Sequence, residues 1–146
     1  MENKKIPERS QVPEEFTWDL SDIFASDDAW FEELEKIKAF PERFLAFKGT
    51  LKESAENLLR FYQLNDETEV RLTKLYGYAS QKSDEDTSNA FYLDMRGKAM
   101  SAIVSISAAS SFATVDTLRE AFERELSPRQ KQLLSRLPFQ SSPVRT

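Results

Sequence analysis

The sequence contains no histidine and no cysteine, and these two absences exclude much of the usual catalytic chemistry. Histidine is the common general base near neutral pH and the commonest zinc ligand. Cysteine is a frequent nucleophile and a soft metal ligand. A chain of 146 residues that lacks both is not expected to be a complete enzyme, so we predict no catalytic, cofactor-binding or metal-binding residues in it. The lack of cysteine also agrees with a reducing cytoplasm.

Turn-forming residues, long apolar runs and positive charge are also in short supply. There are only 3 glycines and 6 prolines, which favours long helices over a sheet joined by many turns. The longest uncharged stretch, 99–115, includes five serines and is too short and polar for a transmembrane helix. The net charge of −5 lacks the basic excess that nucleic-acid binding needs. We therefore expect neither a membrane nor a nucleic acid as a partner.

The first 50 residues predict an arm followed by two short helices. Pro7 and Pro13 prevent a continuous helix over 1–24, so this segment is expected to be extended. Ser26 is a good N-cap for a helix that Pro41 interrupts, and the second piece is expected to end at Gly49. The side chains expected to anchor the arm are Phe16, Trp18, Leu20, Ile23 and Phe24.

The middle of the chain predicts three more helices. The capping box Thr50-Leu-Lys-Glu53 is expected to begin one, and Asp66-Glu-Thr-Glu69 another that stops in the polar segment 83–89. The next helix has an apolar stripe of increasingly small side chains and is expected to be central, with leucine at Ala102 overpacking it. The stripe consists of Phe91, Met95, Ala99, Ala102, Ile103, Ile106 and Ala109.

The last part of the chain predicts two short helices and an unstructured end. Thr114 can cap a helix that ends near Leu126, and Ser127-Pro-Arg-Gln130 is a good start for another. Residues 138–146 are expected to be unstructured. The predicted fold is all-α, an antiparallel helical bundle of about five to seven helices. Its parts are an extended arm over 1–24, a helical lobe over 25–113 and a tail over 114–146 that is helical or partly disordered.

Four aromatic residues are the candidate functional side chains, with two interpretations open. Aromatic residues at helical spacing either pack in a core or line a groove that binds a peptide. The acidic run at 84–86 does not fit a calcium loop, because Asn89 and Met95 stand where that loop needs glycine and glutamate. We interpret this run as a helix-capping turn. The possible peptide-groove or packing residues are Tyr76, Tyr78, Phe91 and Tyr92.

Three segments in the same order resemble one peptidase family. Lys74-Leu-Tyr-Gly-Tyr-Ala-Ser-Gln-Lys-Ser-Asp-Glu-Asp-Thr87 resembles a signature of the oligoendopeptidase F branch of the thimet oligopeptidase-like zinc metallopeptidases. Trp18-Asp-Leu-Ser-Asp-Ile-Phe24 resembles the opening of that family, and Ser107-Ala-Ala-Ser-Ser-Phe112 resembles the end of its next helix. The resemblance covers about residues 16–113. After about Ala113 the chain departs from the family pattern.

The resemblance implies a place in a larger enzyme. Family members are largely helical, cytoplasmic enzymes that cleave short peptides in a deep channel, with a catalytic zinc on a His-Glu-x-x-His helix in the C-terminal half. This chain resembles the N-terminal lobe, which forms a wall or lid of the channel. None of the zinc ligands can be carried over to it. The resemblance therefore implies a chain that is inactive alone, with zinc belonging only to the full-length enzyme.

Other interpretations of the chain stay open at this point. A lobe without its catalytic half exposes an apolar surface, and it could act as a stand-alone helical binding or dimerisation module. It could also be a truncated fragment without activity. The expected partners are accordingly the catalytic half of a parent peptidase, short peptides, or a second copy of the chain.

Overall fold

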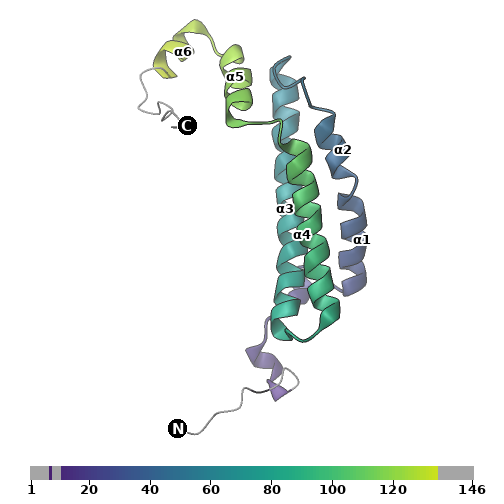
Figure 1. The fold of residues 1–146 in the computed structure, drawn as a ribbon. Helices are drawn as coiled ribbons and strands as arrows, with labels where there is room; N and C mark the ends of the chain where they lie inside the picture. Colours follow the sequence, from purple (N-terminus) through teal and green to yellow (C-terminus); the bar gives the residue numbers. More distant parts are fainter. Residues whose placement is uncertain (1–6, 8–10, 135–146) are drawn as a thin grey trace, which may run out of the picture.

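A computed structural model describes residue 7 and residues 11–134 of the chain. The described residues contain six α-helices, short 3-10 turns and no strand, so the prediction of an all-α fold is confirmed. The helices are α1 (Asp27–Ile37), α2 (Phe40–Leu45), α3 (Ala55–Glu85), α4 (Ala90–Ser110), α5 (Val115–Glu125) and α6 (Pro128–Leu134). Figure 1 shows an elongated molecule in which α3 and α4 form a long antiparallel hairpin, with α1 and α2 along one side. None of the described helices is both long enough and apolar enough to cross a membrane.

Within the described residues of the arm, the side chains that pack on the core are those at its end. Leu20 is buried, whereas Trp18 is 84% exposed. The arm includes two 3-10 turns, η2 (Glu14–Phe16) and η3 (Leu20–Asp22), and η3 directs Leu20 towards the core. The predicted anchors are therefore confirmed for Leu20, Ile23 and Phe24. They are wrong for Phe16 and Trp18, which η2 and the extended residues after it leave in solvent.

Helix α1 begins where the sequence predicts. The Ser26 hydroxyl accepts a hydrogen bond from the backbone N–H of Ala29 at 3.2 Å, which caps the helix. Trp30 is completely buried, and its indole N–H donates to the backbone carbonyl of Leu75 in α3 at 2.8 Å. Pro41 lies in the first turn of α2, so it separates the two helices as expected.

The connection between α2 and α3 differs from the prediction. Helix α2 ends at Leu45, and Gly49 lies beyond it in a turn with a φ of +85°, a conformation that favours glycine. The Thr50 hydroxyl donates to the carbonyl of Phe47 inside this turn and does not cap a helix. Ser54 caps α3 instead, accepting from the N–H of Asn57 at 3.1 Å. The predicted capping box at Thr50 is therefore wrong.

Helix α3 is one continuous element of 31 residues, and the predicted start at Asp66 is wrong. At 1.5 Å per residue its length is about 46 Å. Leu64 and Thr68 are both buried on its inner face, and the Thr68 hydroxyl donates to the Leu64 carbonyl at 2.6 Å. Because this face is buried, α3 continues through the polar segment from Asp66 to Glu69 without a break. The stop in the segment 83–89 is confirmed.

Helix α4 is central, as predicted, because it packs on α1, α2 and α3. Asn89 caps it by accepting from the N–H of Phe91 at 3.0 Å. Ala99 is completely buried, whereas Ala102 is half-buried and borders a hollow of about 390 Å³ between α4 and α1. The closely packed small residue is therefore Ala99 and not the predicted Ala102.

The last two described helices begin at the predicted caps. The Thr114 hydroxyl accepts from the N–H of Thr117, and Ser127 and Gln130 form a reciprocal capping box at the start of α6. Helix α5 packs on α3 through the buried Ala121. The segment 138–146, which we predict to be unstructured, lies outside the described residues.

Candidate functional site

A cluster of Asp27, Tyr78, Tyr92 and Lys82 joins α1, α3 and α4 at one end of the hairpin. Asp27 is the first residue of α1, and its carboxylate accepts hydrogen bonds from the hydroxyls of Tyr78 at 2.8 Å and Tyr92 at 3.3 Å. The ammonium of Lys82 lies 5.7 Å and 5.5 Å from the two ring centres. We call these residues the Asp27 cluster.

The surroundings of the Asp27 cluster keep both phenols protonated. Tyr78 is only 3% exposed, and burial, followed by its hydrogen bond to Asp27, raises the pKa of its hydroxyl. Burial and then the negative charge of Asp27 raise the pKa of Tyr92. A phenol whose pKa is raised in this way stays protonated near neutral pH. The cluster is suited to holding three helices together, not to acid–base chemistry.

The other two candidate aromatic residues, Tyr76 and Phe91, make no hydrogen bond to Asp27 among the described contacts. Tyr76 borders a hollow of about 470 Å³ between α3 and α4, where the Arg96 guanidinium lies 5.9 Å from its ring centre. Phe91 is half-exposed at the start of α4 and lies against the ring of Phe31 at 6.0 Å. The structure thus brings Tyr78 and Tyr92 together through Asp27, packs the ring of Phe91 edge-on against that of Tyr92 at 5.3 Å, and places Tyr76 at the hollow.

Another hollow, of about 610 Å³, lies between the arm and the end of α3. Tyr78 and Lys82 form part of its wall on α3, and Trp18 and Leu20 line it from the arm. The ring of Phe24 also packs edge-on against Tyr78 at 5.6 Å. The hollow therefore joins the arm to the Asp27 cluster.

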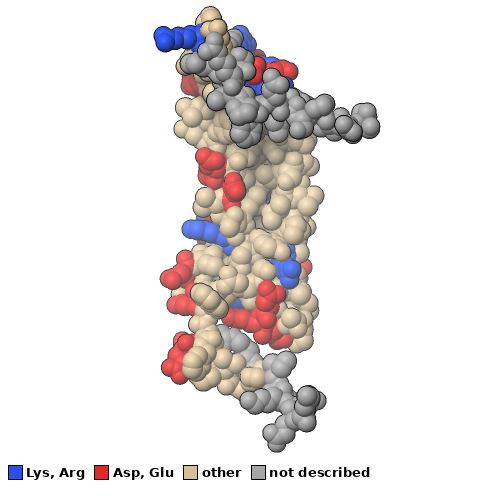
Figure 2. Space-filling model, turned by 90° about the vertical axis from the view of Figure 1, so that its left-hand side faces the viewer, with Lys and Arg blue, Asp and Glu red and all other residues tan. Residues whose placement is uncertain are grey.

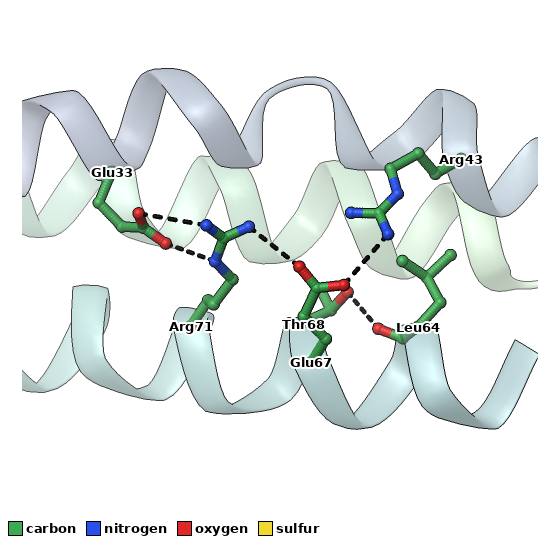
Figure 3. Close-up of polar contacts among 6 residues, drawn as sticks. All are labelled: Glu33, Arg43, Leu64, Glu67, Thr68 and Arg71. Carbon is green, nitrogen blue, oxygen red and sulfur yellow. Dashed lines mark hydrogen bonds and ion pairs between the residues drawn. The ribbon is translucent and has the colours of Figure 1, made fainter. Parts of the chain in front are cut away.

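A chain of ion pairs fixes the α1–α2 layer on α3 (Figure 3). The guanidinium of Arg71 on α3 contacts Glu33 of α1 at 2.6 Å and Glu67 at 3.2 Å, and Glu67 also pairs with Arg43 of α2 at 3.1 Å. Both arginines lie over the ring of Phe40, at 4.3 Å and 5.0 Å. Sequence analysis missed this network. Its only sequence signal is the i, i+4 spacing of Glu67 and Arg71.

The described residues include no group of three or more side chains suited to hold a metal ion. In the acidic run at 84–86, Asp86 accepts hydrogen bonds from the backbone N–H and the hydroxyl of Ser88, and these bonds lower the pKa of Asp86. The run therefore ends α3 with Asp84 and Glu85 and begins the turn to α4 with Asp86. Zinc prefers nitrogen and sulfur ligands, and the 146 residues of this chain include neither histidine nor cysteine. The residues present do not fit a catalytic zinc.

Comparison with known proteins relates the chain to bacterial peptidases. It is 37% identical over 114 residues to oligopeptidase PepF of Bacillus subtilis, and 38% identical over 117 residues to the chromosomal oligoendopeptidase F of Lactococcus lactis subsp. cremoris. It is also 32% identical over 111 residues to the group B oligopeptidase PepB of Streptococcus agalactiae. These matches cover 78%, 78% and 76% of the chain. No protein-family model and no solved structure matches it.

The three relatives are much longer than the segment they share with this chain. The matched segments make up 17%, 19% and 18% of their lengths, so the chain spans less than a fifth of each. The order of the three sequence segments, the all-α fold and these identities agree with one another. The chain therefore belongs to the oligoendopeptidase F family and matches a part of the length of its members.

Proposed function

We propose that this chain is a non-catalytic N-terminal lobe, a wall or lid of the substrate channel, of a cytoplasmic oligoendopeptidase F-type zinc peptidase that cleaves short peptides. The observation that carries the proposal is its identity of 32–38% to three peptidases over more than three quarters of its own length. The sequence has no ligand set for zinc. The catalytic metal and its ligands would come from the remaining part of such an enzyme, with which this lobe would associate.

The architecture suits a wall that confines a peptide and takes no part in its chemistry. A wall has to keep its shape, and three features resist deformation here: the long helix α3, the Asp27 cluster and the ion pairs of Arg71. Charged groups are sparse over the middle of the side that Figure 2 faces, and acidic groups gather towards its lower end. Such a surface leaves a bound peptide free of strong fixed contacts.

A segment exchange tests this proposal. The part of Bacillus subtilis oligopeptidase PepF that matches this chain would be replaced by the corresponding residues of this chain, and the chimera assayed on a short fluorogenic peptide. We expect a folded chimera that cleaves the peptide, with the isolated chain binding no zinc in equilibrium dialysis and cleaving nothing. A folded chimera without cleavage, or zinc-dependent cleavage by the isolated chain, would contradict the proposal.

A stand-alone binding module is the second candidate function. The exposed apolar side chains of α4, which include Met100 and Val104, favour it, because single helices in monomeric proteins usually direct such residues inward. An inactive chimera together with a partner-binding isolated chain would favour this candidate over the peptidase lobe.

A further inference from the structure

Helix α4 has two apolar faces, and the described residues cover one of them. The inner face packs into the core through Met95, Ala99, Ile106 and Ala109. The opposite face is solvent-exposed and uncharged, and its residues follow the spacing i, i+4, i+7, i+11, i+15. We call it the outer face of α4. It consists of Leu93, Gly97, Met100, Val104 and Ala108.

We propose that the outer face of α4 pairs with the same face of a second copy of this chain, with the two helices antiparallel. The inference concerns the chain by itself and goes beyond the peptidase role proposed above. A two-fold axis beside Met100 would place Leu93 of one copy opposite Ala108 of the other, and Gly97 opposite Val104. Leu93 and Val104 then each meet a small residue, and both contacts occur twice, as two-fold symmetry requires, while the two copies of Met100 meet at the axis.

The distribution of charge along α4 selects the antiparallel arrangement. All the charged residues of α4, namely Asp94, Arg96 and Lys98, lie in its first half, and the second half has none. Antiparallel pairing sets the charged half of each helix against the uncharged half of the other. Parallel pairing would bring like charges together and would also set Val104 against Val104 and Gly97 against Gly97, leaving one level crowded and one empty.

The side chains next to the outer face add opposite charges to the pairing. Glu69 borders the hollow between α3 and α4 together with Ser107, and within the described part of the chain it has no ion-pair partner. Arg96 lies over Tyr76, which lines this hollow, and its guanidinium also contacts the exposed Asp84 at 3.7 Å. In the antiparallel dimer, Arg96 of each copy lies beside Glu69 of the other copy. Two carboxylate–guanidinium pairs would then flank the apolar contact.

Gly97 allows the dimer to be disrupted without disturbing the single chain. A Cβ atom added at Gly97 meets nothing within 4 Å, so Gly97→Leu fits the monomer, and leucine is a better helix former than glycine. In the dimer the same leucine would occupy the space that Val104 of the second copy needs. Val104→Lys would bury a charge there. Val70→Lys is the matched control, because Val70 on α3 is 58% exposed and Val104 is 60% exposed. Val70 does not line the hollow between α3 and α4 and does not belong to the outer face of α4.

Sedimentation velocity over a range of concentrations measures the association. We expect the wild-type chain and Val70→Lys to reach twice the single-chain mass of 16.9 kDa. We expect Gly97→Leu and Val104→Lys to stay at the single-chain mass, with Gly97→Leu melting at a temperature no lower than the wild-type monomer. A wild-type chain that is monomeric throughout, or a Gly97→Leu variant that still dimerises, would overturn the proposal.

Disulfide cross-linking tests the direction of the helices, since the sequence has no cysteine of its own. We expect Leu93→Cys mixed with Ala108→Cys to give a cross-linked pair on mild oxidation, whereas neither variant alone does. In the antiparallel dimer two copies of position 93 lie about 22 Å apart along the helix, beyond the reach of a disulfide. Efficient cross-linking of Leu93→Cys with itself would indicate parallel pairing and would refute the arrangement.

Discussion

Replacing Asp27 with alanine should be among the most damaging single changes outside the apolar core. The Tyr78 hydroxyl is buried and would lose its acceptor at 2.8 Å, which costs about 1–3 kcal/mol. The Tyr92 hydroxyl is more exposed and its bond is longer, 3.3 Å, so its loss adds less than about 1 kcal/mol. Loss of a negative charge in the first turn of α1 adds about 0.3–1 kcal/mol. We expect Asp27→Ala to lower the free energy of unfolding by roughly 2–4 kcal/mol.

Urea unfolding followed by circular dichroism measures this loss, and Asp28→Ala is the matched control. Asp28 shares the first turn of α1 but is exposed and has no tyrosine partner, so only the helix-dipole effect of about 0.3–1 kcal/mol applies to it. Tyr78→Phe removes the donor that needs Asp27, so Asp27→Ala should cost less in that background. Equal destabilisation by Asp27→Ala and Asp28→Ala would refute the structural role that we assign to the cluster.

Three further predictions concern pH, packing and fluorescence. Because the pKa of Tyr78 is raised in the folded chain, the stability that its protonated hydroxyl contributes is fully present below pH 10.0, the ordinary tyrosine value, and is lost at higher pH. The melting temperature should therefore fall more steeply with rising alkaline pH for the wild type than for Tyr78→Phe. Ala99→Leu should lower the free energy of unfolding by about 1–3 kcal/mol in urea titrations, whereas Ala102→Leu, beside a hollow, should cost less, and the reverse order would contradict the packing of α4. Acrylamide should quench the fluorescence of the exposed Trp18 and not that of the buried Trp30, and equal quenching in single-tryptophan variants would contradict the position of the arm.

Sequence patterns predicted the helix starts that depend on local hydrogen bonds. Ser26, Thr114 and Ser127 each bond to a backbone N–H within the next three residues, so the signal lies within four residues of sequence. The predicted break at Asp66 failed because burial of Leu64 and Thr68 against the other helices outweighs a helix-propensity penalty of less than about 0.7 kcal/mol per residue. Pattern alone does not show which partner a helix face will have.

The two tyrosines of the candidate site were predictable from the sequence, but Asp27, Lys82 and the arrangement of the four were not. Tyr78 and Tyr92 were selected as aromatic residues of interest, but the group that unites them, Asp27, is 51 and 65 residues away in the sequence. In the sequence Asp27 carries only the signal of a residue that favours the start of a helix. Contacts between distant segments depend on how the helices pack, and a single sequence does not encode this in any local pattern.

The order of the elements also has a consequence for synthesis on the ribosome. The turn between α3 and α4 is short, and the large buried cluster from Leu20 to Ala109 precedes α5, which adds the buried Ala121. Most native contacts therefore join segments that are close in sequence, which favours rapid folding. We expect the hairpin to close as soon as α4 leaves the exit tunnel, before any later segment of a longer chain is available. The outer face of α4 would then already be formed and exposed when any later segment of such a chain is synthesised.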